Sequence, residues 1–243
     1  MKETIFEKDC QARFHGTFGN GKLGKHVMAV SYVPGNGLLH FKDGRLVSDC
    51  LGTCSKVDCS QCGKFGICYA INSYVIRPNV TIARIENTLQ LRNDMKKHFQ
   101  DLEKAIRDNG VKVVRYTESG ELESYEQLIN LYNVAIRNPE TRFYLYTKNY
   151  QVLRCFFDFR VLPTNMVVLI SVWGDQGRDA WNEFKKYRNV KCFAVNSDMQ
   201  VTCNCPAYYK DENGKTKRDS SATCEKCRLC YDSKAKIIGC LEH

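Results

Sequence analysis

Fourteen cysteines in a chain of 243 residues constrain the fold more than any other feature, because eleven of them fall into two short segments. Five lie between positions 50 and 68, and six lie between positions 203 and 240. The N-terminus lacks the basic and apolar stretches of a secretion signal, so we expect a reducing cytoplasm, where disulfides are rare. Dense groups of cysteines in that compartment are typical of metal or iron–sulfur ligation. The sequence therefore predicts two metal sites.

The first cysteine group contains glycines that let the backbone turn tightly, so that several thiolates can converge on one centre. Its predicted metal ligands are Cys54, Cys59, Cys62 and Cys68. We treat Cys50 as a spare thiol. The lone cysteines Cys10, Cys155 and Cys192 are expected to be packing residues.

The second cysteine group reads Cys-x2-Cys-x2-Cys and is preceded at a distance by Cys-Pro, a spacing that resembles ferredoxin-type ligation of a [4Fe–4S] cluster. Its predicted metal ligands are Cys205, Cys224, Cys227 and Cys230. Cys203 is treated as spare, and Cys240 has no assigned role. Zinc is the alternative metal, because all-cysteine zinc sites also use Cys-x2-Cys pairs, whereas the triple spacing favours a cubane cluster.

Apolar strand patterns alternate with amphipathic helices from about residue 80 onward. The strand patterns cover residues 111–116, 143–147, 166–171 and 190–195. One long amphipathic helix is expected from about 80 to 108, and another is expected to begin at Ser124, which forms a capping box with Gln127. Such alternation indicates a parallel sheet covered by helices. The predicted fold is α/β: a partial (β/α) barrel-like parallel sheet with helices, plus a Cys-rich, loop-dominated C-terminal extension.

Four segments are expected along the chain. Residues 1–50 form a short-stranded N-terminal segment, and residues 51–200 form the α/β core with the first Cys loop. Residues 201–240 form the Cys-rich segment of the second cluster, and residues 241–243 look like the remnant of a tag. The Gly19–Gly24 stretch matches G-x-G-x-x-G but follows no strand pattern, so a loop is expected there.

Ligands of open parallel sheets bind at the carboxyl ends of the strands. Candidate ligand-binding residues at these ends are Ser119, Gly120, Glu121, Lys148 and Ser171. Glu121 could bind an ammonium group or be a solvated carboxylate near a helix start. Lys148 could neutralise an anionic ligand or lie on the surface.

An ordered set of motifs runs through this chain from about residue 17 to 232. The motifs are Cys54-Ser-Lys-Val-Asp-Cys59-Ser-Gln-Cys62, Cys68-Tyr-Ala, Glu86-Asn-Thr88, Ser119-Gly-Glu121, Phe143-Tyr-Leu-Tyr-Thr-Lys148, Cys205-Pro-Ala and Cys224-x2-Cys-x2-Cys230. The set resembles the phage and prophage family called gene product 88. The resemblance implies an origin in a phage or mobile element and little about mechanism.

A more distant resemblance is to radical S-adenosylmethionine (SAM) enzymes. Their barrel carries a Cys-aromatic loop after the first strand and a Gly-Gly-Glu motif after the second, which holds the amino group of SAM. Cys68-Tyr69 and Ser119-Gly120-Glu121 stand in corresponding order here. The resemblance implies a radical-SAM-like core, SAM as a ligand and an auxiliary cluster. The usual Cys-x3-Cys-x2-Cys is absent, and four thiolates at the first site would make it structural or electron-transferring.

The sequence thus predicts a phage- or mobile-element-encoded iron–sulfur protein with two [4Fe–4S] clusters and redox or SAM-dependent chemistry on a small molecule at the sheet rim. The alternative is a non-enzymatic protein, stabilised by iron–sulfur or zinc, that binds nucleic acid or a host protein through a basic surface. The formal net charge of +9 is compatible with such partners. No apolar run reaches the roughly 18 residues of a membrane span, so a cytoplasmic location without a membrane partner is expected.

Overall fold

The computed structural model describes residues 10–35, 52–54, 70, 77–195 and 198–241. The predictions for Cys50, Cys59, Cys62 and Cys68 lie outside the described residues, as does much of the expected 1–50 segment.

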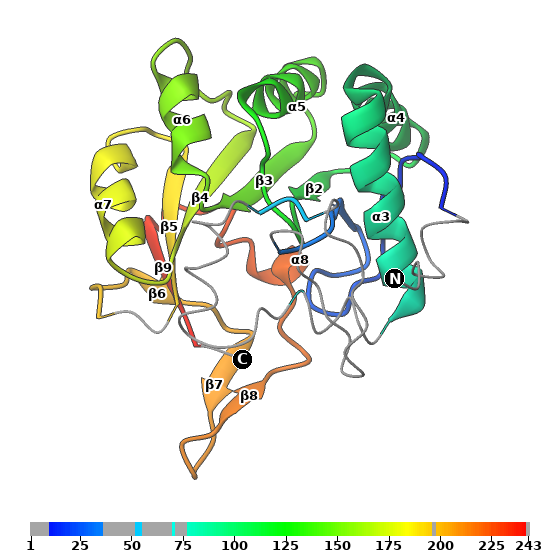
Figure 1. The fold of residues 1–243 in the computed structure, drawn as a ribbon. Helices are drawn as coiled ribbons and strands as arrows, with labels where there is room; N and C mark the ends of the chain where they lie inside the picture. The colour runs from blue at the N-terminus through cyan, green and yellow to red at the C-terminus, as the bar shows by residue number, and fades with distance from the viewer. Residues whose placement is uncertain (1–9, 36–51, 55–69, 71–76, 196–197, 242–243) are drawn as a thin grey trace, which may run out of the picture.

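A seven-stranded sheet forms the centre of the molecule (Figure 1). All of its neighbouring strands are parallel, which confirms the predicted parallel α/β fold. The strand β4 is buried along its whole length, as its apolar sequence predicts. In spatial order the strands are β1 (Val27–Ala29), β2 (Val113–Tyr116), β3 (Arg142–Thr147), β4 (Met166–Val172), β5 (Val190–Val195), β9 (Ile237–Cys240) and β6 (Cys203–Asn204).

The helices between the strands cover one face of the sheet (Figure 1). The first five strands lie in chain order, and right-handed crossovers in one direction place every helix on the same face. The main hydrophobic core fills the space between this face and the helices. Within the described residues the sheet is open, with β1 and β6 at its edges, so closure into a barrel stays a prediction. The helices are α3 (Pro78–Asn93), α4 (Met95–Asp108), α5 (Tyr125–Arg137), α6 (Tyr150–Phe157) and α7 (Asp175–Phe184).

The opposite face of the sheet is covered by the C-terminal segment and by the loop around Leu23. Here Cys230 and Tyr231 pack against Tyr144 and Leu169. The C-terminal segment also contains the short helix α8 (Cys224–Cys227) and a hairpin of β7 (Tyr208–Lys210) and β8 (Thr216–Arg218). The same segment supplies β6 and β9, so it completes the main sheet as well as covering it.

The prediction of one long helix from 80 to 108 is wrong, because the chain breaks at Asp94. This residue adopts φ −150° and ψ 79°, and its side chain accepts a hydrogen bond from the Lys97 N–H at 2.9 Å. It therefore caps a new helix, α4. The Ser124 cap of α5 is confirmed, since its hydroxyl accepts from the Gln127 N–H at 3.1 Å.

Candidate functional site

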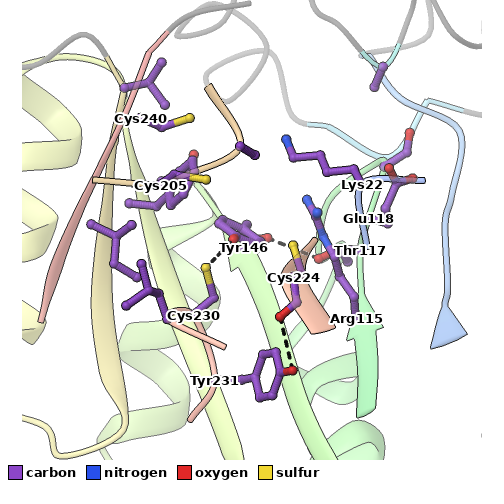
Figure 2. A pocket seen from close by; sticks show the side chains of 18 of the residues that line it. Lys22, Arg115, Thr117, Glu118, Tyr146, Cys205, Cys224, Cys230, Tyr231 and Cys240 are labelled. Atoms are coloured by element: carbon purple, nitrogen blue, oxygen red, sulfur yellow. Dashed lines mark hydrogen bonds between the residues drawn. The ribbon is translucent and has the colours of Figure 1, made fainter. Parts of the chain in front are cut away.

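A cavity of about 140 Å³ lies between the carboxyl ends of the central strands and the C-terminal segment (Figure 2). One water needs about 10–15 Å³ of such space, so the cavity can take a group of many atoms. The structure places all five predicted ligand-binding residues on its walls. They are Ser119, Gly120 and Glu121 after β2, Lys148 after β3, and Ser171 in β4.

Cysteines from both sequence groups line this cavity. Cys54 represents the first group, and its other predicted ligands lie outside the described residues. All four predicted ligands of the second group, Cys205, Cys224, Cys227 and Cys230, are present, together with Cys240. Figure 2 shows the sulfur atoms of Cys205, Cys224, Cys230 and Cys240 facing the same space. Cys54, the predicted ligands of the second group and the strand-end residues therefore meet at one place.

Backbone hydrogen bonds position the second cysteine group. The N–H of Cys205 donates to the carbonyl of Gly239 at 2.7 Å, which ties it to β9. The N–H of Cys224 donates to the carbonyl of Lys22 at 3.0 Å, which ties α8 to the loop before β1. The thiol of Cys230 accepts from the hydroxyl of Tyr146 at 2.9 Å. Three separate parts of the chain thus hold these thiols around the cavity.

The turn at Ser119–Glu121 is packed tightly against the segment that carries Cys54. The Glu121 N–H donates to the Thr53 hydroxyl at 2.9 Å, and the Cys54 N–H donates to the Gly35 carbonyl at 2.8 Å. Gly120 has φ +80°, a conformation that favours glycine. The turn and the start of the first cysteine loop are therefore one structural unit.

Glu121 is buried, so the interpretation of a solvated carboxylate is wrong. One carboxylate oxygen accepts from the Leu122 N–H at 2.8 Å and the Thr147 hydroxyl at 2.6 Å, and the other accepts from the Lys148 N–H at 2.8 Å. These bonds join the turn after β2 to the end of β3. These hydrogen bonds fix the orientation of the Glu121 carboxyl group on the cavity wall.

Two positive side chains face the cysteines from the other wall of the cavity (Figure 2). Lys22 has a lowered pKa, because burial and the charge of Arg115 outweigh the opposite effect of the nearby thiols. The Arg115 guanidinium lies 4.7 Å from the centre of the Tyr146 ring. Positive charge close to thiols favours their thiolate form, which is the form that binds metals.

The thiols differ in their tendency to ionise. A hydrogen bond with Cys240, together with one to the Ala207 backbone and the charge of Lys22, lowers the pKa of Cys205 to about 6, against the effect of burial. Burial raises the pKa of Cys230 to about 12, although the Tyr146 hydrogen bond opposes this.

The donor set fits a thiolate-ligated metal centre. Five cysteines of one segment and two cations border a single cavity, and soft thiolates select iron–sulfur clusters and zinc. Among the residues that the structure describes, no three Cys, His, Asp or Glu side chains are already gathered at ion-binding distance.

Several residues of the site were not among the predicted site residues, and they include Cys240, Lys22 and Arg115. Arg115 could have been found from the sequence, because it is a charged residue in an otherwise apolar strand. In the structure it is only 7% exposed. Lys22 lies in a loop whose distance from the cysteines no local pattern reveals. Cys203, by contrast, is not among the residues that line the cavity.

A family model described as gene product 88 matches residues 15–233. The chain belongs to the gene product 88 family. This match covers the residues of the site from Lys22 to Tyr231 but not Ile238 and Cys240, and it confirms the resemblance to that family. No curated protein and no solved structure matches this gene product 88 chain, so the resemblance to radical SAM enzymes has no support from them. Within the described ranges, no helix is long and apolar enough to cross a membrane.

Proposed function

We propose that this gene product 88 protein is a phage- or mobile-element-encoded iron–sulfur protein. Its two [4Fe–4S] clusters would serve redox or SAM-dependent chemistry at the carboxyl end of the sheet. One observation carries the proposal: Cys54, five cysteines of the second group and the Ser119–Glu121 turn line the same cavity. A small molecule bound on the turn would share that cavity with the thiols.

The residues of this chain divide into two roles under the proposal. Cys205, Cys224, Cys227 and Cys230 would hold one cluster. Three of Cys54, Cys59, Cys62 and Cys68 would hold the other in the SAM-dependent case, because SAM needs an open iron, and all four would hold it in the redox case. A bound cluster supplies one-electron transfer. Glu121 and Lys148 offer opposite charges on the wall, which suits the ammonium and carboxylate groups of an amino acid such as the methionine part of SAM.

The radical-SAM-like part of the proposal has support from the order of the strands. Strands β1 to β5 follow one another in chain order, and the helices α3 to α7 between them lie on one face, as in a partial (β/α) barrel. The turn that carries Glu121 follows the second strand of this series.

The test is electron paramagnetic resonance of anaerobically purified, dithionite-reduced protein, with and without SAM, together with iron and zinc analysis. We expect about eight irons per chain for two clusters and a [4Fe–4S] signal that SAM changes. A Cys155→Ser variant is the matched control, because Cys155 lies in α6 and does not line the cavity. A signal that SAM leaves unchanged would overturn SAM chemistry, and zinc without iron would overturn the iron–sulfur assignment.

A metal-stabilised, nucleic-acid-binding protein is the second candidate, and the β7–β8 hairpin favours it. This hairpin projects from the molecule (Figure 1) and exposes Tyr209 by 51% beside Lys210, Lys217 and Arg218. Exposed aromatic and basic side chains together bind single-stranded nucleic acid by stacking and charge. This function is supported if the protein binds a single-stranded oligonucleotide in a salt-dependent way and the Tyr209→Ala variant binds it more weakly. Equal binding by the natural protein and the variant would show that Tyr209 of the hairpin does not contribute to binding.

A further inference from the structure

The last strand of the sheet brings one more thiol to the cavity than the predicted ligand set contains. In the parallel pair of β6 and β9, Cys203 lies opposite Ile238, and Asn204 lies opposite Gly239. The next step in this register places Cys205 beside Cys240. Neighbouring strands are about 4.8 Å apart, so the side chains of Cys205 and Cys240 lie next to each other at the carboxyl end of these two strands.

The same register separates Cys240 from Cys203. Cys203 and Cys205 are two residues apart and point to the same face, but Cys203 lies one pleat, about 6.6 Å, nearer the amino ends of the strands. At that level its neighbour is Ile238, which is fully buried in the apolar cluster of this face. Cys205 and Cys240 line the cavity, whereas Cys203 is not among its lining residues. The position along the strand therefore decides which thiol reaches the site.

Other features of the cavity place Cys240 with the predicted metal ligands. Its sulfur faces the same space as those of Cys205, Cys224 and Cys230 (Figure 2). Lys22 lies on the facing wall, and Cys240, Cys224 and Cys205 each act to raise its pKa. Cys240 is only 7% exposed, so a thiolate there would need a metal or a cation to compensate its charge.

We propose that Cys240 is a ligand of the metal centre in this cavity, which deepens the proposed function and rests on it. A [4Fe–4S] cluster takes four protein ligands, so a bond from Cys240 releases one thiol of the Cys-x2-Cys-x2-Cys segment. In two-cluster ferredoxins a cysteine of one motif ligates the other cluster, and Cys54 borders the same cavity here. The released thiol is therefore available to the first cluster.

The test compares iron, sulfide and zinc per chain in the natural protein, Cys240→Ala and Cys203→Ala, each reconstituted anaerobically. The two variants are closely matched, since both remove a thiol from the same face of adjacent strands. We expect Cys240→Ala to lose about half of the metal and Cys203→Ala to keep it. Full metal content in Cys240→Ala would overturn the assignment of Cys240. Natural protein without any metal would instead overturn the proposed function.

A second variant keeps the test decisive if the alanine chain does not fold. Cys240→His offers an imidazole in place of the thiolate. We expect it to retain metal with an altered electron paramagnetic resonance spectrum, because the ligand type changes the cluster signal and potential. A spectrum identical to that of the natural protein would show that residue 240 does not touch the cluster. Circular dichroism of the metal-free chains establishes that each variant is folded.

Discussion

Gly120 fixes the candidate ligand-binding turn at the scale of a single residue. A Cβ atom at this position would lie 2.6 Å from the hydroxyl of Thr53 and 2.8 Å from the Cβ of Tyr32. Tyr32 follows β1 and Thr53 precedes Cys54, so both neighbours belong to segments that build the rim of the cavity. The close approach of three backbone segments therefore depends on the absence of a side chain at 120.

We predict that Gly120→Ala lowers the free energy of unfolding by about 3 kcal/mol, from the left-handed backbone and from the overpacking. Gly110→Ala is the control, because Gly110 also has a positive φ of 58° but a Cβ there would meet no atom within 4 Å. It should cost about 1 kcal/mol. Urea denaturation of both variants measures the difference, and equal losses would contradict the packing argument.

Lys22 should tune the reduction potential of a cluster in the cavity. A nearby positive charge stabilises the reduced, more negative state of the cluster, so its removal lowers the potential. We predict that Lys22→Gln lowers the midpoint potential by on the order of 60 mV, which is about 1.4 kcal/mol for one electron. Lys25→Gln, an exposed lysine of the same loop, is the control. Equal potentials in a redox titration of the two variants would contradict this role.

At the scale of elements, α3 fastens the N-terminal segment through buried polar side chains. Glu86 accepts hydrogen bonds from the Gln11 N–H at 3.0 Å and from the Arg13 side chain at 2.6 Å. Asn87 accepts from the His15 N–H at 2.7 Å and donates to the carbonyls of His15 and Ser31, each at 3.0 Å. The Glu86-Asn87-Thr88 motif of the family therefore has a structural role in this chain.

Asn87→Ala should lower the free energy of unfolding by about 2–3 kcal/mol, because it leaves one N–H and two carbonyls without their partner in a buried place. Asn93→Ala, at the exposed end of the same helix, should change it by less than about 0.5 kcal/mol. Hydrogen exchange of residues 11–33 would show whether the loss is local. Protection equal to that of the natural protein would argue against the fastening role.

At the scale of the whole molecule, a buried hydrogen-bonded network lies within the main core. The Tyr32 hydroxyl contacts the His98 ring at 2.8 Å and donates to the Tyr116 hydroxyl at 2.5 Å. The other ring nitrogen of His98 lies 3.1 Å from the Gln90 side-chain oxygen. Burial lowers the pKa of His98 to about 3, although Asp101 opposes the shift. His98 therefore stays neutral in the folded protein.

This histidine makes the stability of the protein sensitive to mild acid. Below pH 6.5 the unfolded chain takes up a proton at His98 and the folded chain does not, so stability falls as the pH falls. Between pH 7 and pH 5 the loss from His98 alone should be about 2 kcal/mol. His98→Gln should remove that part of the slope in urea titrations. Parallel pH profiles for the two proteins would contradict the prediction.

Local patterns in the sequence predicted much of the sheet and part of the site. Apolar runs located β2 to β5, and the strand ends located Glu121 and Lys148, because both signals depend only on nearby residues. The break at Asp94 was missed, since apolar spacing continues across it. The place of Cys240 depends on the pairing of β6 with β9, and the burial of Glu121 depends on Thr147 and Lys148. Contacts of this kind join distant segments and leave no local pattern.

The position of β9 has a consequence for how the protein is made. This strand lies between β5 and β6, yet it comes after both of them in the chain. Among the described strands, β9 is the one that pairs with β6, so during synthesis this pairing waits until residues 237–240 have emerged. The wall of the cavity that holds Cys205 and Cys240 is therefore assembled last, after the helices and central strands. Metal loading at that wall must follow translation, and a premature stop shortly before Ile237 would produce a chain with most of its sheet and no completed site.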